Sequence, residues 1–403
     1  MGLNDVVSAE RLHVGFFGLR NAGKSSLLNA VTGQSMSVVS DVKGTTTDPV
    51  KKAMELLPLG PVLMIDTPGL DDEGDLGQMR VEKARQILAQ TDLAVLVLDA
   101  GIGMQDEDRT IVKELQERKI PYVIAYNKAD RLLERPKLEG DALYVSAVSG
   151  EGIEQLKELL GTFAKKLQAP KYVVRDLLSV GDVVVLVTPI DESAPKGRLI
   201  LPQQMVLREV LDAHAIAVVC QETELAKTMQ KLGCKPRMVI TDSQVFGKVA
   251  KNTPQDVPLT SFSILMARYK GDLKELVHGF TVLKSLKEGD RVLISEGCTH
   301  HRQCNDIGTV KMPKWIEDFS GVKPEYHFTS GGEFPSELID YRVIVHCGGC
   351  MLNEAEMKHR IACAATAGVP IVNYGIAIAG MHGILARSLE LFPDVLSLLE
   401  ERE

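Results

Sequence analysis

The chain has 403 residues, of which 45% are hydrophobic and 25% charged, and its formal net charge is −8. This composition is typical of a globular protein with two or three domains, and the lack of a long lysine or arginine block argues against a surface that binds nucleic acid or anionic lipid throughout. No stretch is long and apolar enough to span a bilayer, and residues 1–12 contain no apolar signal segment, so we expect a cytoplasmic protein with no membrane or nucleic-acid partner.

A phosphate-binding loop is the first motif along the chain. It runs from Gly18 to Ser25, after an apolar run at residues 13–17 that predicts a buried strand and before a helical pattern at residues 26–31. Backbone N–H groups at a helix N-terminus face bound phosphate, Lys24 reaches the β and γ phosphates, and the Ser25 hydroxyl binds Mg²⁺. The nucleotide-binding residues predicted here are Asn21, Gly23, Lys24, Ser25 and Ser26.

Two further segments carry the signals expected for the γ-phosphate and its metal ion. Asp66 follows an apolar run at residues 62–65, where its carboxylate would hold Mg²⁺ through water, and the N–H of Gly69 would sense the γ-phosphate. A polar segment at residues 44–48 precedes this strand, and we favour Thr46 as the threonine that reaches Mg²⁺. The predicted catalytic residues are Lys24, Thr46 and Gly69.

The base is predicted from two later strands. Residues 122–126 and 143–145 are apolar runs, and polar residues follow each of them. The carboxylate of Asp130 can accept hydrogen bonds from guanine N1 and N2 together, and adenine offers no such pair of donors. We therefore expect GTP and GDP as ligands. The predicted base-binding residues are Asn127, Lys128, Asp130, Ser146 and Ala147.

On these motifs, residues 10 to about 165 resemble small GTPases of the TrmE, Era and EngA type. The resemblance implies that Asn21 helps to bind K⁺ and that GTP hydrolysis is slow and assisted by cations. Leu70 stands where Ras-like proteins carry a glutamine that orients the attacking water. Stabilisation of the transition state would then rest on Lys24, Mg²⁺ and the monovalent ion, which favours a switch or timer.

Beyond a linker predicted at residues 168–170, short apolar runs alternate with helical patterns. The alternation predicts two smaller parallel α/β domains after the P-loop GTPase domain, so the fold class is α/β. The middle domain shows no phosphate motif and no acid–base pair, and we assign it to homodimerisation by elimination. The predicted strands are residues 183–187, 215–219, 238–240, 291–294, 343–345 and 370–372, and the predicted helices are residues 204–214, 223–232 and 353–367.

Seven cysteines occur, crowded toward the C-terminal third, and their odd number argues against a disulfide framework. Cys347 and Cys350 flank two glycines, a turn that lets both sulfurs converge, and Cys298 on another loop can complete a set of three thiolates. Such a set suits either an iron–sulfur cluster with one labile iron or a zinc site. For three further cysteines we expect a packing role, because free cysteine behaves as a small buried hydrophobe; they are Cys220, Cys234 and Cys363.

With a GTPase in front of Cys-x-His and His-Cys-x-x-Cys, the whole chain resembles the HydF family, GTPases that take part in maturation of [FeFe]-hydrogenase. The resemblance implies a [4Fe–4S] cluster on Cys298, Cys347 and Cys350, with His300 and His346 as motif histidines. It also implies a scaffold that works with two radical-SAM maturases and passes a diiron precursor to apo-[FeFe]-hydrogenase. The implied domains are residues 1–168 for GTP binding, 169–266 for dimerisation and 267–403 for the cluster.

Two points stay open from the sequence. The fourth cluster ligand could be His300, His346, a carboxylate such as Asp191, or an exogenous group. The competing function is a regulatory GTPase whose C-terminal part is a zinc-stabilised module that contacts ribosome or RNA, although the acidic balance of the chain counts against it. A redox enzyme gated by GTP would need a substrate site, and the sequence shows none.

Overall fold

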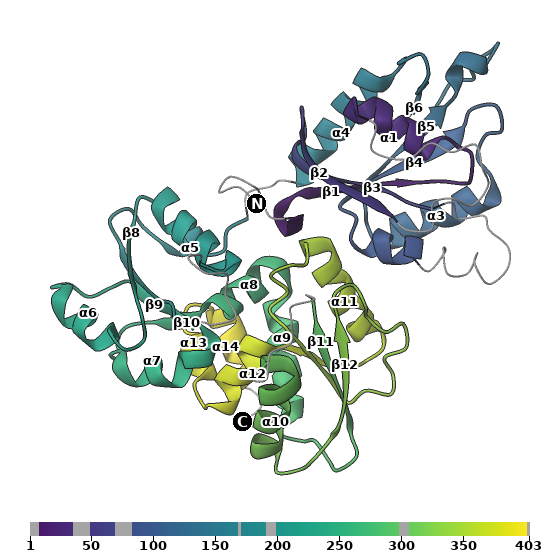
Figure 1. Ribbon diagram of the computed structural model, residues 1–403. Coiled ribbons are helices and arrows are strands. Elements are labelled where there is room, and N and C mark those ends of the chain that lie inside the picture. Colours follow the sequence, from purple (N-terminus) through teal and green to yellow (C-terminus); the bar gives the residue numbers. More distant parts are fainter. Residues whose placement is uncertain are drawn as a thin grey trace. The chain divides into compact units, whose positions relative to one another are not determined.

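The structure, a computed structural model, describes residues 8–34, 49–68, 83–167, 171–190, 199–297 and 306–400 (Figure 1). The chain forms two compact units, Met1–Pro170 and Lys171–Glu403. The predicted residues Thr46, Gly69, Leu70, Asp191, Cys298 and His300 lie outside the described residues.

The N-terminal unit is built on a six-stranded sheet in the order β2-β3-β1-β4-β5-β6. All its neighbouring strands pair in parallel except β2 and β3, which are antiparallel. The central strands are almost fully buried, which explains their continuous apolar runs, whereas β2 alternates between exposed and half-buried residues, as an edge strand does. The strands are β1 (Leu12–Phe17), β2 (Val50–Leu56), β3 (Gly60–Asp66), β4 (Leu93–Asp99), β5 (Tyr122–Asn127) and β6 (Ala142–Tyr144).

Helices cover both faces of this sheet. Helices α1 (Lys24–Thr32) and α4 (Ile153–Leu167) pack together over one face, where Leu28 and Leu160 join the same apolar core. Helix α3 (Asp106–Glu117) covers the other face through Ile111 and Leu115 (Figure 1). This arrangement leaves the carboxyl ends of the parallel strands as the edge at which functional loops meet.

The C-terminal unit contains two four-stranded parallel sheets. The first has the order β10-β9-β7-β8 and the second β12-β11-β13-β14. The first sheet comprises β7 (Val183–Val187), β8 (Ile216–Cys220), β9 (Met238–Thr241) and β10 (Leu259–Ser261), and the second comprises β11 (Arg291–Glu296), β12 (Glu325–Ser330), β13 (Val343–His346) and β14 (Ile371–Asn373).

The helices of this unit join the two sheets through one continuous apolar core, which holds residues of β7 and of β11 alike. The boundary suggested by the sequence, between residues 266 and 267, falls inside helix α8 (Phe262–Lys270). No helix of the described residues is long and apolar enough to cross a membrane. The helices are α5 (Leu201–Asp212), α6 (Leu225–Lys231), α7 (Phe246–Asn252), α8 (Phe262–Lys270), α9 (Leu273–Leu283), α10 (Met312–Ser320), α11 (Glu354–Thr366), α12 (Tyr374–Met381), α13 (Leu385–Ser388) and α14 (Pro393–Glu400).

Gly279 allows α9 to approach β14 closely. A Cβ atom at this position would lie 2.1 Å from the carbonyl oxygen of Ile371, a backbone atom that cannot rotate away. Helix α9 therefore rests on the second sheet through its own backbone, and any side chain at residue 279 would push the helix outward.

We expect Gly279→Ala to lower the free energy of unfolding of the C-terminal unit by about 1–3 kcal/mol, the usual cost of overpacking. Gly247→Ala on α7 is the matched control, because its Cβ would meet no atom within 4 Å. Alanine there is expected to be neutral or to stabilise by about 0.5–1 kcal/mol. Urea unfolding followed by fluorescence of Trp315, the single tryptophan, measures both variants. Equal free energies of unfolding for the two would contradict the close approach.

Candidate functional site

The phosphate loop connects β1 to the first turn of α1. Two of its residues adopt the left-handed conformation, Asn21 with φ 59° and Gly23 with φ 91°. A Cβ at Gly23 would lie 2.3 Å from the side-chain nitrogen of Asn127, so glycine is required there. The ammonium of Lys24 lies within the curve of the loop and donates to the carbonyls of Gly18 (3.0 Å) and Leu19 (2.8 Å).

Ser25 and Asp66 meet at the predicted Mg²⁺ position. The Ser25 hydroxyl donates to Asp66 Oδ2 at 2.5 Å, although the two residues come from different elements, α1 and β3. The second oxygen, Asp66 Oδ1, is buried and has no hydrogen-bond partner in the described protein. A hydroxyl beside a buried carboxylate oxygen of this kind fits Mg²⁺ and its coordinated water. Ser26 lies in the same turn of α1 and is half-buried.

The predicted base-binding residues lie together at the ends of β5 and β6. Asn127 ties them to the phosphate loop, because its side chain donates to Ala22 O (3.0 Å) and accepts from Ala147 N (3.1 Å). Ser146 donates to Asp130 Oδ1 at 2.6 Å, which orients that carboxylate. Asn127 and Ser146 are buried, so these contacts are shielded from solvent.

Lys128 links the base pocket to Asn21 through a residue that the sequence did not reveal, Asp99. Its ammonium donates to Asn21 O and to Asp99 Oδ2, both at 2.6 Å. Burial alone would raise the pKa of Asp99, but the Lys128 hydrogen bond and the Gly101 N–H outweigh it, so this pKa lies below its usual value. Asp99 ends β4 at the carboxyl edge of the sheet, and that position was the available signal.

Cys347 is held at the carboxyl edge of the second C-terminal sheet. Its backbone N–H donates to Ser295 O at 2.9 Å and continues the pairing of β13 with β11. Its sulfur accepts from Gly297 N (3.0 Å) and more weakly from Gly349 N (3.4 Å). Backbone N–H groups that point at a cysteine sulfur fit a metal-bound thiolate, because they compensate its negative charge.

Cys350 follows in the same loop, and burial raises the pKa of its thiol. No group of three or more cysteine, histidine or acidic side chains placed to hold a metal occurs among the residues that the structure describes. The described residues thus supply two of the three predicted cysteines.

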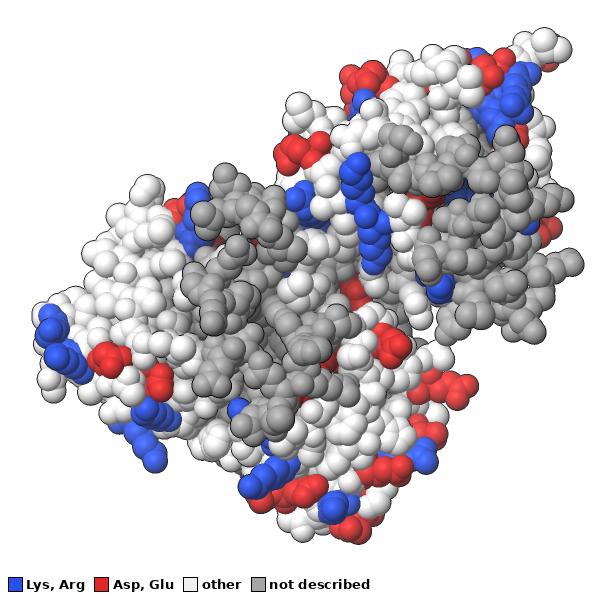
Figure 2. Space-filling model, viewed as in Figure 1, with Lys and Arg blue, Asp and Glu red and all other residues white. Residues whose placement is uncertain are grey.

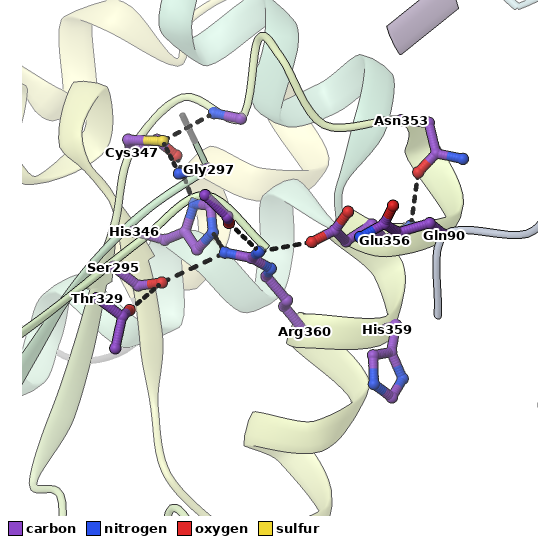
Figure 3. Close-up of polar contacts among 12 residues, drawn as sticks. Gln90, Ser295, Gly297, Thr329, His346, Cys347, Asn353, Glu356, His359 and Arg360 are labelled. Atoms are coloured by element: carbon purple, nitrogen blue, oxygen red, sulfur yellow. Dashed lines mark hydrogen bonds and ion pairs between the residues drawn. The ribbon is translucent and has the colours of Figure 1, made fainter. Parts of the chain in front are cut away.

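A buried polar network lies behind Cys347 (Figure 3). Arg360 on α11 is 1% exposed and forms an ion pair with Glu356 at 2.5 Å. Its guanidinium also donates to Gly331 O (2.7 Å) and to His346 Nε2 (3.1 Å). A fourth contact, to the hydroxyl of Ser295 at 3.3 Å, completes a network that connects α11 with β11 and β13.

His346 is fully buried, and protein atoms occupy both of its ring nitrogens. Nδ1 lies 2.7 Å from the carbonyl oxygen of Cys347, which can only accept, so Nδ1 carries the hydrogen. Nε2 must then accept from Arg360, and the imidazole is neutral. In this arrangement His346 orients the backbone of Cys347 and offers no nitrogen to a metal, so the predicted ligand role would require the ring to leave Arg360.

The other cysteines differ from one another. Cys220, at the end of β8, and Cys363, on α11, are half-buried. Cys234 is exposed, so its predicted packing role was wrong. It follows Gly233, whose left-handed conformation (φ 64°) ends the helical course of the chain after α6.

Three family models match successive parts of the chain. Residues 13–128 match a 50S ribosome-binding GTPase, residues 173–271 the hydrogen maturase F dimerization domain, and residues 274–391 the hydrogen maturase F tetramerization domain. The last two together cover more than half of the chain.

The curated relatives match the N-terminal part. The tRNA modification GTPase MnmE of Nitrosomonas europaea is 36% identical over 156 residues, 38% of this chain and 34% of the relative. GTPase Der of Kosmotoga olearia is 30% identical over 191 residues, 42% of this chain and 43% of the relative. Among solved structures, a variant of Aquifex aeolicus Era bound to GDP and AlF₄⁻ is 20% identical with a TM-score of 0.35, covering 52% of this chain and 93% of Era. The chain thus spans about a third of the MnmE relatives that it matches.

The fold, the phosphate loop and these matches define an α/β protein with an N-terminal P-loop GTPase domain. Two further parallel sheets follow that domain. The chain belongs to the hydrogen maturase F (HydF) family.

We expect Arg360→Leu to lower the free energy of unfolding by about 3–5 kcal/mol, because it leaves Glu356 buried without its partner. The double variant with Glu356→Leu removes both charges and should recover much of this loss. Urea unfolding followed by Trp315 fluorescence measures the difference between the two. A loss below about 1 kcal/mol in the single variant, the value typical of an exposed ion pair, would contradict the buried network.

Proposed function

We propose that this chain is a GTP-hydrolysing scaffold that carries a [4Fe–4S] cluster and delivers a diiron precursor to apo-[FeFe]-hydrogenase. The observation that carries the proposal is the loop of Cys347 and Cys350, with N–H groups aimed at a sulfur, in a chain of the HydF family. Radical-SAM maturases that make the precursor and the hydrogenase that receives it are the proposed partners. We infer a cytoplasmic location, where these partners would act.

The GTPase chemistry is proposed to follow the phosphate loop. Lys24 would bind the β and γ phosphates, and Ser25 with Asp66 would hold Mg²⁺, which supplies charge neutralisation at the γ-phosphate when bound. Asn21 would contribute to a K⁺ site. Thr46 remains the proposed threonine that reaches Mg²⁺, and Gly69 remains the proposed sensor of the γ-phosphate. Turnover is expected to be slow, because Leu70 has no polar group to orient water.

Asp130→Asn is expected to weaken GDP binding by about tenfold to a hundredfold, because it removes the carboxylate that accepts from guanine N1 and N2. Xanthine has a carbonyl in place of the 2-amino group, so the asparagine NH₂ should improve binding of xanthosine diphosphate. Calorimetric titration with both nucleotides measures the switch, and Asp141→Asn, an exposed carboxylate, serves as control. Unchanged GDP affinity in Asp130→Asn would refute the proposed base pocket.

The cluster is proposed to bind through Cys298, Cys347 and Cys350, with the fourth iron open to His300, Asp191 or an exogenous group. The engaged nitrogens of His346 favour a supporting role for that residue over ligation. When bound, the cluster would supply an exchangeable iron position at which a precursor could attach. The chain's own contribution is to orient the thiolates and to shield them on the side of the buried Arg360 network.

Homodimerisation is proposed to use the edge strand β8. This strand forms one edge of its sheet and pairs with β7 on the other side. Ile216 and Val219 are 54% and 45% exposed, an apolar pattern on a strand edge that invites pairing with another strand. A second copy of β8 would extend the sheet and place its own side chains beside Ile216 and Val219, which point to opposite faces.

Val219→Lys is therefore expected to weaken dimer formation at least tenfold, because a lysine on an edge strand opposes its pairing with another strand. The control is Val180→Lys, which changes another exposed valine (78% exposed) outside β8. Sedimentation velocity over a concentration series gives the dissociation constants. Equal dimer stability in the two variants would exclude β8 as the contact.

The alternative is a regulatory GTPase with a zinc-stabilised module that contacts ribosome or RNA. On the face shown in Figure 2, the described lysines and arginines are scattered among acidic side chains rather than gathered in a stripe. Together with the net charge of −8, this pattern disfavours a nucleic-acid partner. The metal content of the protein separates the two functions.

After anaerobic purification, we expect iron and acid-labile sulfide, with a cubane-type EPR signal on reduction. Cys347→Ser should lose this signal, because it removes a proposed ligand. Cys363→Ser, which changes another half-buried cysteine of the same unit, should keep it. Stoichiometric zinc with no sulfide, even after reconstitution, would instead support the alternative function.

A further inference from the structure

Lys270 is a buried lysine at the C-terminal end of α8. The residue is 2% exposed, and its ammonium donates to Leu352 O at 2.8 Å, Cys350 O at 3.1 Å and Gly349 O at 3.5 Å. An ammonium taken out of water is costly unless hydrogen bonds replace its hydration. The three carbonyls supply that replacement, and all of them belong to the loop that carries Cys347 and Cys350.

This loop needs outside support because little regular structure holds it. It connects β13 with α11 and contains two glycines, of which Gly349 has φ 61°. Within the loop, Leu352 N donates to Gly349 O at 3.1 Å. Hydrogen bonds to a charged group are stronger than those between neutral groups, so the ammonium holds three carbonyls of this loop together.

The charge of Lys270 also acts on the neighbouring sulfur. The Lys270 ammonium donates to the backbone carbonyl of Cys350 itself at 3.1 Å, so its positive charge lies next to a proposed cluster ligand. A positive charge fixed beside a thiolate favours added negative charge at that place. For a bound cluster, which gains an electron on reduction, the same charge raises the reduction potential.

We propose that Lys270 is a positioning residue for the metal loop, residues 347–353: its ammonium fixes the backbone from Gly349 to Leu352 and would place a positive charge near a cluster held by Cys347 and Cys350. This inference rests on the proposed metal-binding role of Cys347 and Cys350.

The contact joins two parts of the family architecture. Lys270 lies in the segment that matches the dimerization domain, whereas the loop lies in the segment that matches the tetramerization domain. A second hydrogen bond joins the same two segments: the side chain of Asn373, at the end of β14, donates to Ser263 O on α8 at 3.2 Å. Movement of α8 would thus reach the metal loop directly through Lys270.

The test compares three substitutions of Lys270 with Lys274→Met, a control that changes an exposed lysine on α9. Methionine removes the donor and the charge, glutamine keeps a donor without the charge, and arginine keeps both. Amide hydrogen exchange of residues 346–353 in metal-free protein reports loop order. The reduction potential of the reconstituted cluster reports the charge.

We expect Lys270→Met to speed exchange in the loop at least tenfold and to shift the potential to a more negative value. Lys270→Gln should shift the potential in the same direction, while Lys270→Arg and Lys274→Met should stay close to the parent protein. If the methionine variant does not fold, the proposal is tested by comparing the reduction potential of the cluster in the glutamine variant with that in the arginine variant. Parent-like exchange and potential in the methionine variant, or equal potentials for glutamine and arginine, would overturn the proposal. If the parent protein takes up no cluster, the proposed function fails, and the exchange rates still decide the role of Lys270 in the loop.

Discussion

The parallel pairing of β11 with β13 is the constraint on which the proposed metal site depends. Ser295 pairs with His346 at the end of this ladder, so the residues that follow both strands emerge side by side. Gly297 can then donate to the sulfur of Cys347 although 50 residues separate them in sequence. A slip of β13 by one residue would turn His346 to the opposite face and break its contact with Arg360.

Two buried cations, on two different helices, stabilise the carboxyl edge of this sheet where the Cys347 loop begins. Arg360 reaches it from α11 and fixes His346, and Lys270 reaches it from α8 and fixes the loop carbonyls. Both are costly to bury and are compensated by several acceptors, which makes the arrangement specific as well as stable. In the GTPase domain a half-buried lysine, Lys128, similarly connects two segments at the carboxyl edge of the sheet, because it donates to both Asn21 O and Asp99 Oδ2.

The sequence predicted those parts of the fold in which a short motif directly follows an apolar strand. The phosphate loop, Asp66 and the Asn127 segment are short motifs directly after apolar strands, and the structure brings the described members together. The helix of α12 was not predicted as such, because Gly375 and Gly380 disfavour a helix. Their roles are tertiary: a Cβ at Gly380 would lie 2.1 Å from the ring of Phe280, and one at Gly375 would lie 2.3 Å from Ser263. Strand β12 was missed because it is an edge strand with a polar, half-exposed sequence.

The supporting residues of the candidate site could not be predicted for a related reason. A basic residue at a helix end, such as Lys270, usually faces solvent, and a Glu–Arg pair four residues apart, such as Glu356 and Arg360, usually forms a surface ion pair. Only the packing of distant elements makes them buried, and a single sequence carries no signal for that.

Activation of apo-[FeFe]-hydrogenase by the purified chain tests the central claim most directly. The chain would be isolated from cells that make the radical-SAM maturases, and hydrogen production by the recipient enzyme would be measured. The account predicts activation by the parent protein and by Cys363→Ser, and none by Cys350→Ser. Equal activation by the Cys350→Ser protein would contradict a role for this loop in carrying the precursor.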